Sequence, residues 1–325
     1  MLKKNKRAIL VCGGYIPSQM LYLIPIINSY CEKKKISTIL FHDPLPSLVQ
    51  KNKYVRNWLN RHDIIYLNDV FSYSKVSLLE KLLIIFKSLQ LSLMVSRTLL
   101  LNNFSWKYNQ LIHSVWDLSM LNSNKEELSP NFSQKLKASY KINTDMFTLE
   151  KAIENFTIDT TFIGHTVYQD RGKLAILREK SAKIYAFANF CFYQLPKKYD
   201  TAWNMPENKI LKLIISKIKK RDVSQYWDKR IKGKGDYEDS VIASKIITKK
   251  NASPYPKNVI LLHIFKDSPF NLIDTSRIYS DYVDWIIETL KIVSESNEKW
   301  AIRYHPNARR WGENQKAVIK KIYEL

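Results

Sequence analysis

The hydrophobic pattern at the start of the chain alternates between short apolar runs and longer amphipathic segments. Apolar runs at 7–12, 36–41 and 63–67 predict strands. The segments between them, 17–30 and 47–60, have the periodicity of helices. Strands and helices that take turns along a chain are typical of a parallel sheet with helical crossovers. We therefore expect the chain to begin with an α/β lobe of the Rossmann type.

The middle of the chain has a helical pattern, after which the alternation returns. Helices are predicted at 76–101, 106–121 and 134–155. A strand, a helix and a strand then follow at 158–163, 172–181 and 183–188. The pattern predicts that the first lobe carries a helical insertion in its middle.

The segment 76–101 is the longest apolar stretch in the sequence, and its apolar residues occupy most faces of the predicted helix. Lys81, Lys87 and Arg97 interrupt it, whereas a transmembrane helix needs about 20 predominantly apolar residues. We therefore predict no transmembrane helix. Two interpretations of this segment remain open: a helix buried in the lobe, and an interfacial helix that rests on anionic lipid.

A second α/β pattern begins at residue 258. It consists of a strand, a helix and a strand at 258–265, 279–293 and 300–304. Asn, Ser and two prolines cluster at 251–257, where we place a linker between a first lobe at 1–250 and a second lobe at 258–325. Two strands are too few for a stable open sheet, so we expect the second lobe to be incomplete.

The charge of the chain is strongly positive, with 52 Lys and Arg residues against 30 Asp and Glu residues and a net charge of +22. A field of this size attracts nucleic acid, anionic lipid or nucleotide-linked substrates. The alternative is a lysine-rich composition without a binding role. Because lysine dominates the positive charge, the case for nucleic-acid recognition, which favours arginine, is the weaker one.

The cysteines and the N-terminus indicate a cytoplasmic protein. Cys12, Cys31 and Cys191 have neither the spacing of a metal site nor that of a disulfide framework, which is typical of a reduced compartment. The apolar stretch 8–12 is too short for the core of a secretory signal peptide.

Candidate chemistry is expected where strands end, because ligands of open α/β sheets bind beyond the carboxyl ends of the strands. That rule selects five places in this sequence: Gly13-Gly14, His42-Asp43, Gly164-His165, Lys266-Asp267-Ser268, and Arg303 through His305. The paired glycines would let backbone N–H groups approach an anion or a sugar, although they also suit a purely structural turn. No spacing of His, Cys, Asp or Glu predicts a metal site.

The segment after residue 164 is the densest polar cluster and is expected on the acceptor side, together with Gly13 and Gly14. It carries His165, Tyr168, Asp170 and Arg171. Imidazole and carboxylate can both accept the proton that a hydroxyl group must lose when it attacks, so His165 and Asp170 are candidate general bases. The alternative is a solvated loop in which His165 caps the following helix.

The segment Arg303-Tyr304-His305-Pro306 is the second cluster. Strand alternation places Arg303 and His305 on one side, and Pro306 ends the strand because it cannot donate to a ladder. Both side chains can donate hydrogen bonds to a phosphate. We expect them to bind a donor substrate together with the loop Lys266, Asp267 and Ser268.

The second lobe resembles the start of the C-terminal lobe in bacterial capsular polysaccharide glycosyltransferases. The resemblance spans residues 258–307 and is carried by Asp267 in a loop, by Asp281 with Trp285 in an aromatic-rich helix, and by the R-x-H-P segment at residues 303–306. Those enzymes are of the GT-B type, and some relatives transfer Kdo or sialic acid from CMP-sugars. The resemblance implies two Rossmann-type lobes and assigns His305, with Arg303 beside it, to the phosphate of a nucleotide-sugar. Members of this family continue into further donor-binding elements, so we expect this chain to be C-terminally truncated.

The resulting hypothesis is a bacterial glycosyltransferase that moves a sugar from a nucleotide-sugar to a growing capsular or other surface polysaccharide. No cofactor or metal is expected, because side chains and helix ends can stabilise the leaving phosphate. The positive charge would suit peripheral contact with the anionic inner face of the cytoplasmic membrane. Two alternatives remain: a catalytically inactive remnant, and a non-enzymatic nucleic-acid-binding protein, for which no binding module is recognisable.

Overall fold

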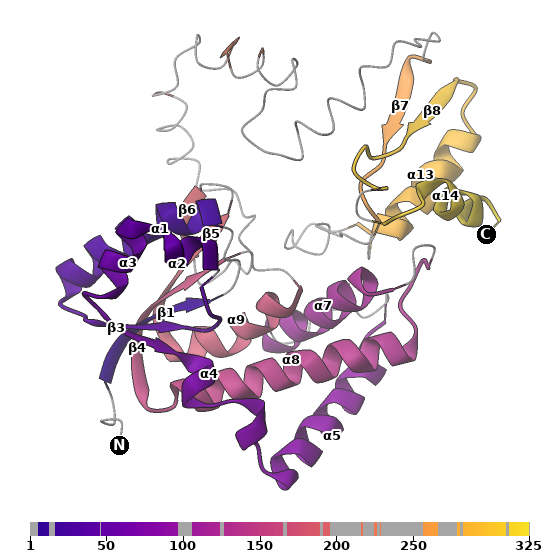
Figure 1. Ribbon diagram of the computed structural model, residues 1–325. Coiled ribbons are helices and arrows are strands. Elements are labelled where there is room, and N and C mark those ends of the chain that lie inside the picture. Colours follow the sequence, from indigo (N-terminus) through magenta and orange to yellow (C-terminus); the bar gives the residue numbers. More distant parts are fainter. Residues whose placement is uncertain are drawn as a thin grey trace. The chain divides into compact units, whose positions relative to one another are not determined.

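The first part of the chain forms a six-stranded sheet of order β3-β2-β1-β4-β5-β6 (Figure 1). Its strands are β1 (Lys6–Cys12), β2 (Thr38–Phe41), β3 (Asp63–Tyr66), β4 (Phe156–Ile163), β5 (Ser181–Ala188) and β6 (Cys191–Gln194). Strands β1 to β5 are parallel, and β6 pairs antiparallel with β5. The predicted α/β lobe with a parallel, Rossmann-like sheet is confirmed. The edge strand β6 was not predicted.

The computed structural model describes residues 6–12, 17–45, 47–96, 106–123, 127–164, 168–188, 191–195, 216, 224–225, 228, 256–265, 278–279, 282–309 and 312–324. The chain divides into two units. The first comprises 1–122, 130–204 and 271–278, and the second comprises 123–129, 205–270 and 279–325. The predicted linker at 251–257 lies almost entirely outside the described residues.

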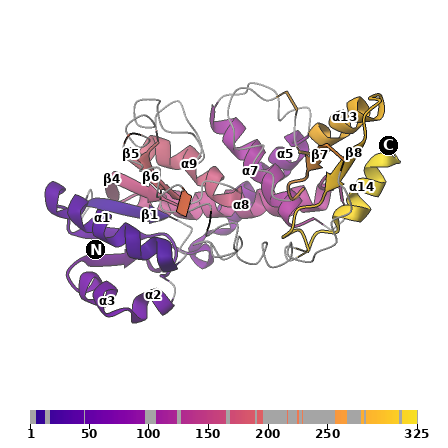
Figure 2. The ribbon, with the colours of Figure 1, turned by 90° about the horizontal axis from the view of Figure 1, so that it is seen from above.

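Helices cover both faces of the sheet in the first unit (Figure 2). They are α1 (Pro17–Lys34), α2 (Ser47–Lys51), α3 (Lys53–Leu59), α4 (Leu67–Val70), α5 (Leu78–Met94), α7 (Trp106–Leu121), α8 (Phe132–Ile153) and α9 (Tyr168–Lys180), with a short 3₁₀ turn at Tyr73–Lys75. Ile9 and Val11 of β1 pack with α1 and α3. The alternating Ala8, Leu10 and Cys12 pack with α8 and α9. A central parallel strand is therefore apolar throughout, since both of its faces are covered.

The helix boundaries differ from the prediction at several places. Helix α5 ends at Met94, although a helix was predicted as far as residue 101, and α1 continues to Lys34. The segment predicted as one helix at 47–60 is two, because Asn52 caps α3 by accepting hydrogen bonds from the backbone N–H groups of Tyr54 and Val55. Helix α9 begins at Tyr168 and not at residue 172. Asp170 and Arg171 therefore lie in the first turn of a helix, which corrects the loop predicted there.

The helices α5, α7 and α8 form a further layer with its own apolar core. Helix α9 packs closely against this layer at Gly172, where a Cβ atom would lie 2.9 Å from Ile142 Cγ2 and 3.3 Å from Ser114 Oγ. That distance leaves no room for a side chain, which explains one of the few glycines in the chain. No helix among the described residues is long and apolar enough to cross a membrane.

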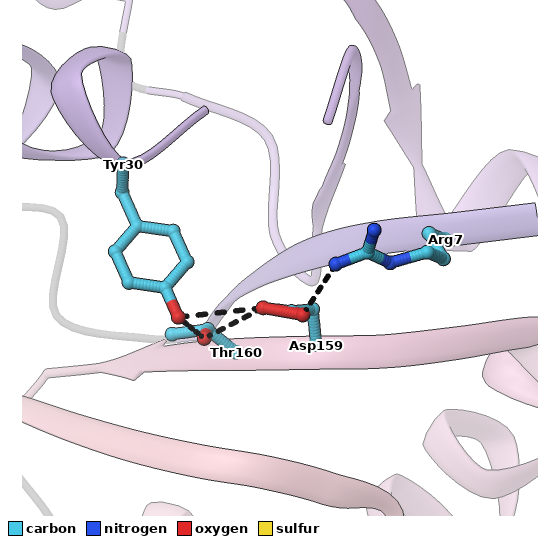
Figure 3. Close-up of polar contacts among 4 residues, drawn as sticks. All are labelled: Arg7, Tyr30, Asp159 and Thr160. Atoms are coloured by element: carbon cyan, nitrogen blue, oxygen red, sulfur yellow. Dashed lines mark hydrogen bonds and ion pairs between the residues drawn. The ribbon is translucent and has the colours of Figure 1, made fainter. Parts of the chain in front are cut away.

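A bulge in β4 is held by a polar network away from the carboxyl edge of the sheet (Figure 3). Ala8 pairs with Ile158 and Ile9 with Thr160, so Asp159 is the extra residue. The Asp159 carboxylate accepts from Arg7 Nη2 at 2.8 Å and from the Tyr30 hydroxyl at 3.3 Å. Burial raises the pKa of Tyr30, and the neighbouring carboxylate adds to this. The network ties α1, β1 and β4 together and is structural.

The second unit contains, among its described residues, two parallel strands and two helices. They are β7 (Asn258–Leu261), α13 (Tyr282–Ser294), β8 (Trp300–Arg303) and α14 (Gln315–Tyr323). Tyr282, Ile286 and Leu290 of α13 are buried against the strands and α14. The apolar helix face predicted between the two strands is confirmed. The two-lobed GT-B arrangement stays a prediction.

Candidate functional site

The first candidate site lies at the carboxyl ends of β1 and β4. These strands are neighbours in the sheet, but the connections that follow them run in opposite directions: β1 is followed by β2 on one side, and β4 is followed by β5 on the other. A crevice suited to ligands forms where the strand order reverses in this way. The backbone N–H of Gly164 donates to the Cys12 carbonyl at 2.9 Å, and that of His42 donates to the Val11 carbonyl at 2.9 Å. These two hydrogen bonds join the carboxyl ends of β2 and β4 to that of β1, so the three strands end at the same edge of the sheet.

A buried lysine on α9 is the centre of this site. Lys173 is 2% exposed, and its Nζ donates to Asp170 Oδ1 at 2.7 Å. The same Nζ lies 3.4 Å from Nδ1 of His42, which follows β2. Asp43 Oδ2 lies 2.9 Å from the same ring nitrogen. Four ionisable groups from α9 and from the end of β2 therefore meet at the carboxyl edge, and we call them the Lys173 cluster.

The charges of this cluster depend on one another. Burial alone would lower the pKa of Lys173, but the carboxylates of Asp170 and Asp43 outweigh burial and hold that pKa above its ordinary value. Burial alone would raise the pKa of Asp43, whereas the hydrogen bond and charge of His42 bring it below its ordinary value. Burial raises the pKa of Asp145 on α8, an effect that Lys173 and His42 oppose. Lys173 is therefore the cation on which several carboxyl groups depend.

His42 and Asp43 have the arrangement of a base and the group that orients it. The contact of His42 Nδ1 to Asp43 Oδ2, at 2.9 Å, is shorter than the 3.4 Å contact to Lys173. We therefore assign the ring proton to Nδ1, where it is donated to Asp43. In the neutral ring Nε2 is then an acceptor, and a positioned imidazole of this kind can take a proton from a hydroxyl group.

The structure brings some of the predicted acceptor-side residues together and separates others. Asp170 belongs to the Lys173 cluster. Arg171 is 4% exposed and donates through Nε to Gln110 Oε1 of α7 at 2.8 Å, so it lies between helices and not at the crevice. Three predicted residues, His165, Gly13 and Gly14, lie outside the described residues, as does the side chain of Tyr168.

Sequence reasoning missed Lys173 and Asp145. Lys173 stands three residues after Asp170, a spacing that brings two side chains together once the segment is known to be helical. Asp145 lies three residues after Ile142 and four before Leu149, both buried residues of α8. A carboxyl group on an apolar helical stripe was the available signal, because an acidic residue at such a position needs a partner.

The second candidate site lies in the second unit, where β7 and β8 end. Gln315, at the start of α14, is 4% exposed. Its Oε1 accepts from the backbone N–H of His305 at 2.6 Å, and its Nε2 donates to the His263 carbonyl at 2.7 Å. Buried Glu313 accepts from Gln315 Nε2 at 2.8 Å and from the Phe265 N–H at 3.1 Å. These two side chains join the ends of both strands to α14.

A hollow of ≈440 Å³ opens beside this junction. His305, Arg309 and Lys316 line it, together with Asn314, which caps α14 by accepting from the Ala317 N–H at 3.3 Å. His305 Nδ1 accepts from the Asn307 N–H at 3.1 Å, so the neutral ring carries its proton on Nε2 and is a donor there. The hollow thus combines cations with a helix N-terminus, and Glu313, which accepts from Gln315 Nε2 and the Phe265 N–H, also lines it.

Of the residues predicted to bind the donor substrate, the structure places one, His305, at the hollow. His305 lines the hollow, but Arg303 is exposed and does not. Arg303 was expected to point with His305 because strand alternation puts them on one side. The strand ends at Arg303, so this alternation does not extend to His305, and Arg309 and Lys316 supply the cations instead. Lys266, Asp267 and Ser268 lie outside the described residues.

Replacing Gln315 with leucine is expected to destabilise the second unit by about 2–4 kcal/mol. The change leaves the His305 N–H and the His263 carbonyl without their partner, and each buried group left unpaired costs about 1–3 kcal/mol. Hydrogen–deuterium exchange of the full chain would measure this, as faster exchange in peptides that cover 258–265 and 300–307. Lys320→Leu on the exposed side of α14 is the control, and equal exchange in both variants would contradict the role of Gln315.

Within the described ranges no three His, Cys, Asp or Glu residues are grouped so that they could hold a metal ion. Comparison with protein-family models, with curated proteins and with solved structures finds no match to this chain. The class of protein that the structure defines is therefore an α/β protein whose first unit has a Rossmann-like parallel sheet. Its function has to be inferred from the two sites themselves.

Proposed function

We propose that this protein is a glycosyltransferase that uses a nucleotide-sugar to extend a capsular or other surface polysaccharide. The observation that carries the proposal is the hollow at the end of β8, which His305, Arg309 and Lys316 line beside the N-terminus of α14. Such a combination suits a phosphate, since cations, an imidazole N–H and the positive end of a helix dipole all favour an anion. The resemblance of residues 258–307 to capsular polysaccharide glycosyltransferases assigns His305 to the same role.

The chemistry of the hollow fits the departure of a nucleotide. When the glycosidic bond of a nucleotide-sugar breaks, negative charge develops on the phosphate that leaves. Donors positioned before the reaction stabilise that charge without reorganisation, which is the largest single contribution in many enzymes. His305 Nε2, Arg309 and Lys316 would supply these donors.

The Lys173 cluster supplies the complementary chemistry on the acceptor side. A hydroxyl group that attacks a sugar must lose its proton, and His42, oriented by Asp43, is placed to accept one. Asp170 holds Lys173 through an ion pair at 2.7 Å, so we assign it to positioning and propose His42 as the base. His165 remains a further candidate from the sequence.

Nucleotide binding tests the proposal. At fixed salt, one of CMP, UDP or GDP is expected to stabilise the chain by about 2.7 kcal/mol at 100 times its dissociation constant. His305→Ala should abolish that stabilisation. His62→Ala is the matched control, because His62 lies on the other unit and bonds through Nδ1 to the Trp58 carbonyl at 3.0 Å.

The other outcomes separate the alternative classes. A folded chain that no nucleotide stabilises would contradict the proposal and favour an inactive remnant. Binding to nucleic acid that weakens steeply with salt, without an effect of any nucleotide, would favour a nucleic-acid-binding protein.

A further inference from the structure

Helix α5 presents a broad apolar face to solvent. Leu79 is 78% exposed and Leu93 is 72% exposed, although both belong to a well-formed helix of the first unit. We define the outward face of α5 by its exposed apolar residues: Leu78, Leu79, Leu82, Leu83, Ile85, Phe86, Leu89 and Leu93. In Figure 1, α5 lies at the edge of this unit, with α8 between it and the sheet. The interpretation as a buried helix is therefore wrong for this face.

The inward face of α5 carries two serines, Ser88 and Ser92, among its four buried residues, and the other two are Ile84 and Leu91. Buried Ser88 donates to the Ile84 carbonyl at 2.6 Å and accepts from Asn143 Nδ2 of α8 at 3.1 Å. Ser92, also buried, donates to the Leu89 carbonyl at 2.8 Å. A helix on the surface of a water-soluble protein normally has the opposite polarity, with its apolar stripe toward the core. Most of the aliphatic side chains of α5 point instead toward solvent, and only Ile84 and Leu91 are buried.

The helix is formed before anything contacts this face. Ser77 and Glu80 make a capping box, in which each side chain meets the backbone N–H of the other residue. Helices α5 and α8 also share an apolar core that includes Leu91 and Ala138. A partner of the outward face therefore gains apolar contact without the cost of folding a disordered segment.

The composition and charge of this face favour lipid as the partner. Protein interfaces are enriched in Tyr, Trp and Arg and have a polar rim, whereas the exposed side chains of this face are Leu, Ile and Phe, with Gln90 among them. With about 100° per residue, exposed Lys87 falls on the border of the face beside Leu83, whereas Lys81 lies on the inward side, over the Tyr73 ring at 5.3 Å. Basic residues that flank an apolar helical face are typical of helices that lie in an anionic lipid interface.

A hollow beside the face is consistent with the same partner. It has a volume of ≈420 Å³ and lies between α5, α7 and α8. Leu83, Met146 and Phe147 give it apolar walls, and Lys87 lines it together with Glu150 and with Lys107, which pairs with Glu179 at 3.1 Å. The apolar walls suit an acyl chain, and Lys87 is the cation available to the phosphate of its headgroup.

We propose that the outward face of α5 docks on an anionic lipid bilayer, with its leucines and Phe86 in the acyl boundary and Lys87 at the headgroups. This inference does not rest on the proposed function, because neither candidate site contributes to it. It makes the protein peripheral to a membrane through one helix and explains why so much apolar surface is exposed.

Vesicle flotation of the full chain tests the inference. The protein should float with vesicles of equal parts phosphatidylcholine and phosphatidylglycerol and remain behind with phosphatidylcholine alone. The triple variant Leu82→Gln, Phe86→Gln and Leu93→Gln should bind at least about tenfold more weakly, since each apolar group withdrawn from lipid loses about 0.8 kcal/mol per methylene.

The control carries three glutamines at exposed apolar positions elsewhere, Leu21, Tyr54 and Ile292, and should bind as the unmodified chain does. Thermal unfolding of both variants should match the unmodified chain, because all six side chains are exposed. Equal flotation of the two triple variants would overturn the proposal, as would equal binding to both vesicle types. A dimer that the α5 variant dissociates, with no flotation, would assign the face to a second copy of the chain.

Discussion

Replacing Lys173 with methionine is expected to destabilise the first unit by about 3–5 kcal/mol at neutral pH, because breaking a buried ion pair leaves uncompensated charge behind. The Lys173 side chain is 3% exposed and that of Asp170 is 15% exposed. Without the ammonium group, the Asp170 carboxylate would lose its ion-pair partner, and Asp43 and Asp145 would lose the positive charge that lowers their pKa values. Urea unfolding of both proteins, monitored through the first unit, measures the difference.

The pH dependence of this effect follows from the direction of each pKa shift. In the unmodified chain the pKa of Asp43 is lowered, so its contribution to stability is present above the ordinary Asp pKa and is lost as the pH falls through the lowered value. Lys173 lowers the pKa values of Asp43 and Asp145, so its loss would raise both values. Carboxyl groups whose pKa values are raised in the folded state stabilise it as they take up protons. The deficit of Lys173→Met should therefore shrink as the pH falls toward about 4.

Lys107→Met is the matched control for Lys173→Met, because Lys107 also belongs to the first unit. It forms an ion pair with Glu179 at 3.1 Å, but the two side chains are 46% and 56% exposed. Exposed pairs contribute about 0–1 kcal/mol, so this variant should lose little stability. Comparable losses of stability in the two variants would show that burial does not increase the contribution of the Lys173 ion pair.

The second large effect is expected at His42. Replacing His42 with glutamine should lower turnover by about 10²–10⁴-fold, the usual contribution of a general base. Under the proposed function, affinity for the nucleotide should not change, because His42 belongs to the first unit and the hollow beside His305 to the second. Release of nucleotide from the matching nucleotide-sugar, in the presence of a glycan acceptor, measures turnover, and the thermal stabilisation measures binding.

His62→Gln is the control for this prediction, because it removes another imidazole of the first unit that bonds through Nδ1. Asp43→Asn should have an intermediate effect, since it weakens the orientation of the ring without removing the base. Full turnover in His42→Gln would exclude His42 as the base. In that case His165 would become the leading candidate.

The predictable part of the fold came from local patterns. The apolar runs that predicted strands correspond to β1, β2, β3, β4, β5, β7 and β8. Their positions could be read because a strand in a parallel sheet is apolar on both faces. Helix α7 spans the predicted 106–121. The break at Asn52 was missed because a cap shifts a boundary without changing the periodicity. The start of α9 at Tyr168 was missed because the polar residues of its first turn were interpreted as a loop.

The sequence predicted where in the fold the candidate sites lie better than it predicted which residues form them. His42-Asp43, Asp170 and His305 were selected because they follow strands, and strand ends are where α/β sheets bind ligands. Lys173, Gln315 and Glu313 were not selected, because each lies inside or just before a helix. Nothing in the local pattern separates such a residue from a solvated helix surface.

The sequence by itself determined which segments are strands and helices, since that depends on neighbours within a few residues. The tertiary structure alone decided which side chains meet. His42 and Lys173 are 131 residues apart in the sequence and come together because β2 and β4 both flank β1. It also decided which face of α5 remains exposed, because a helix that is apolar nearly all round can be buried on any side. The packing that buries Ile84, Ser88, Leu91 and Ser92, with Ser88 bonded to Asn143 of α8, leaves most of the leucines outside.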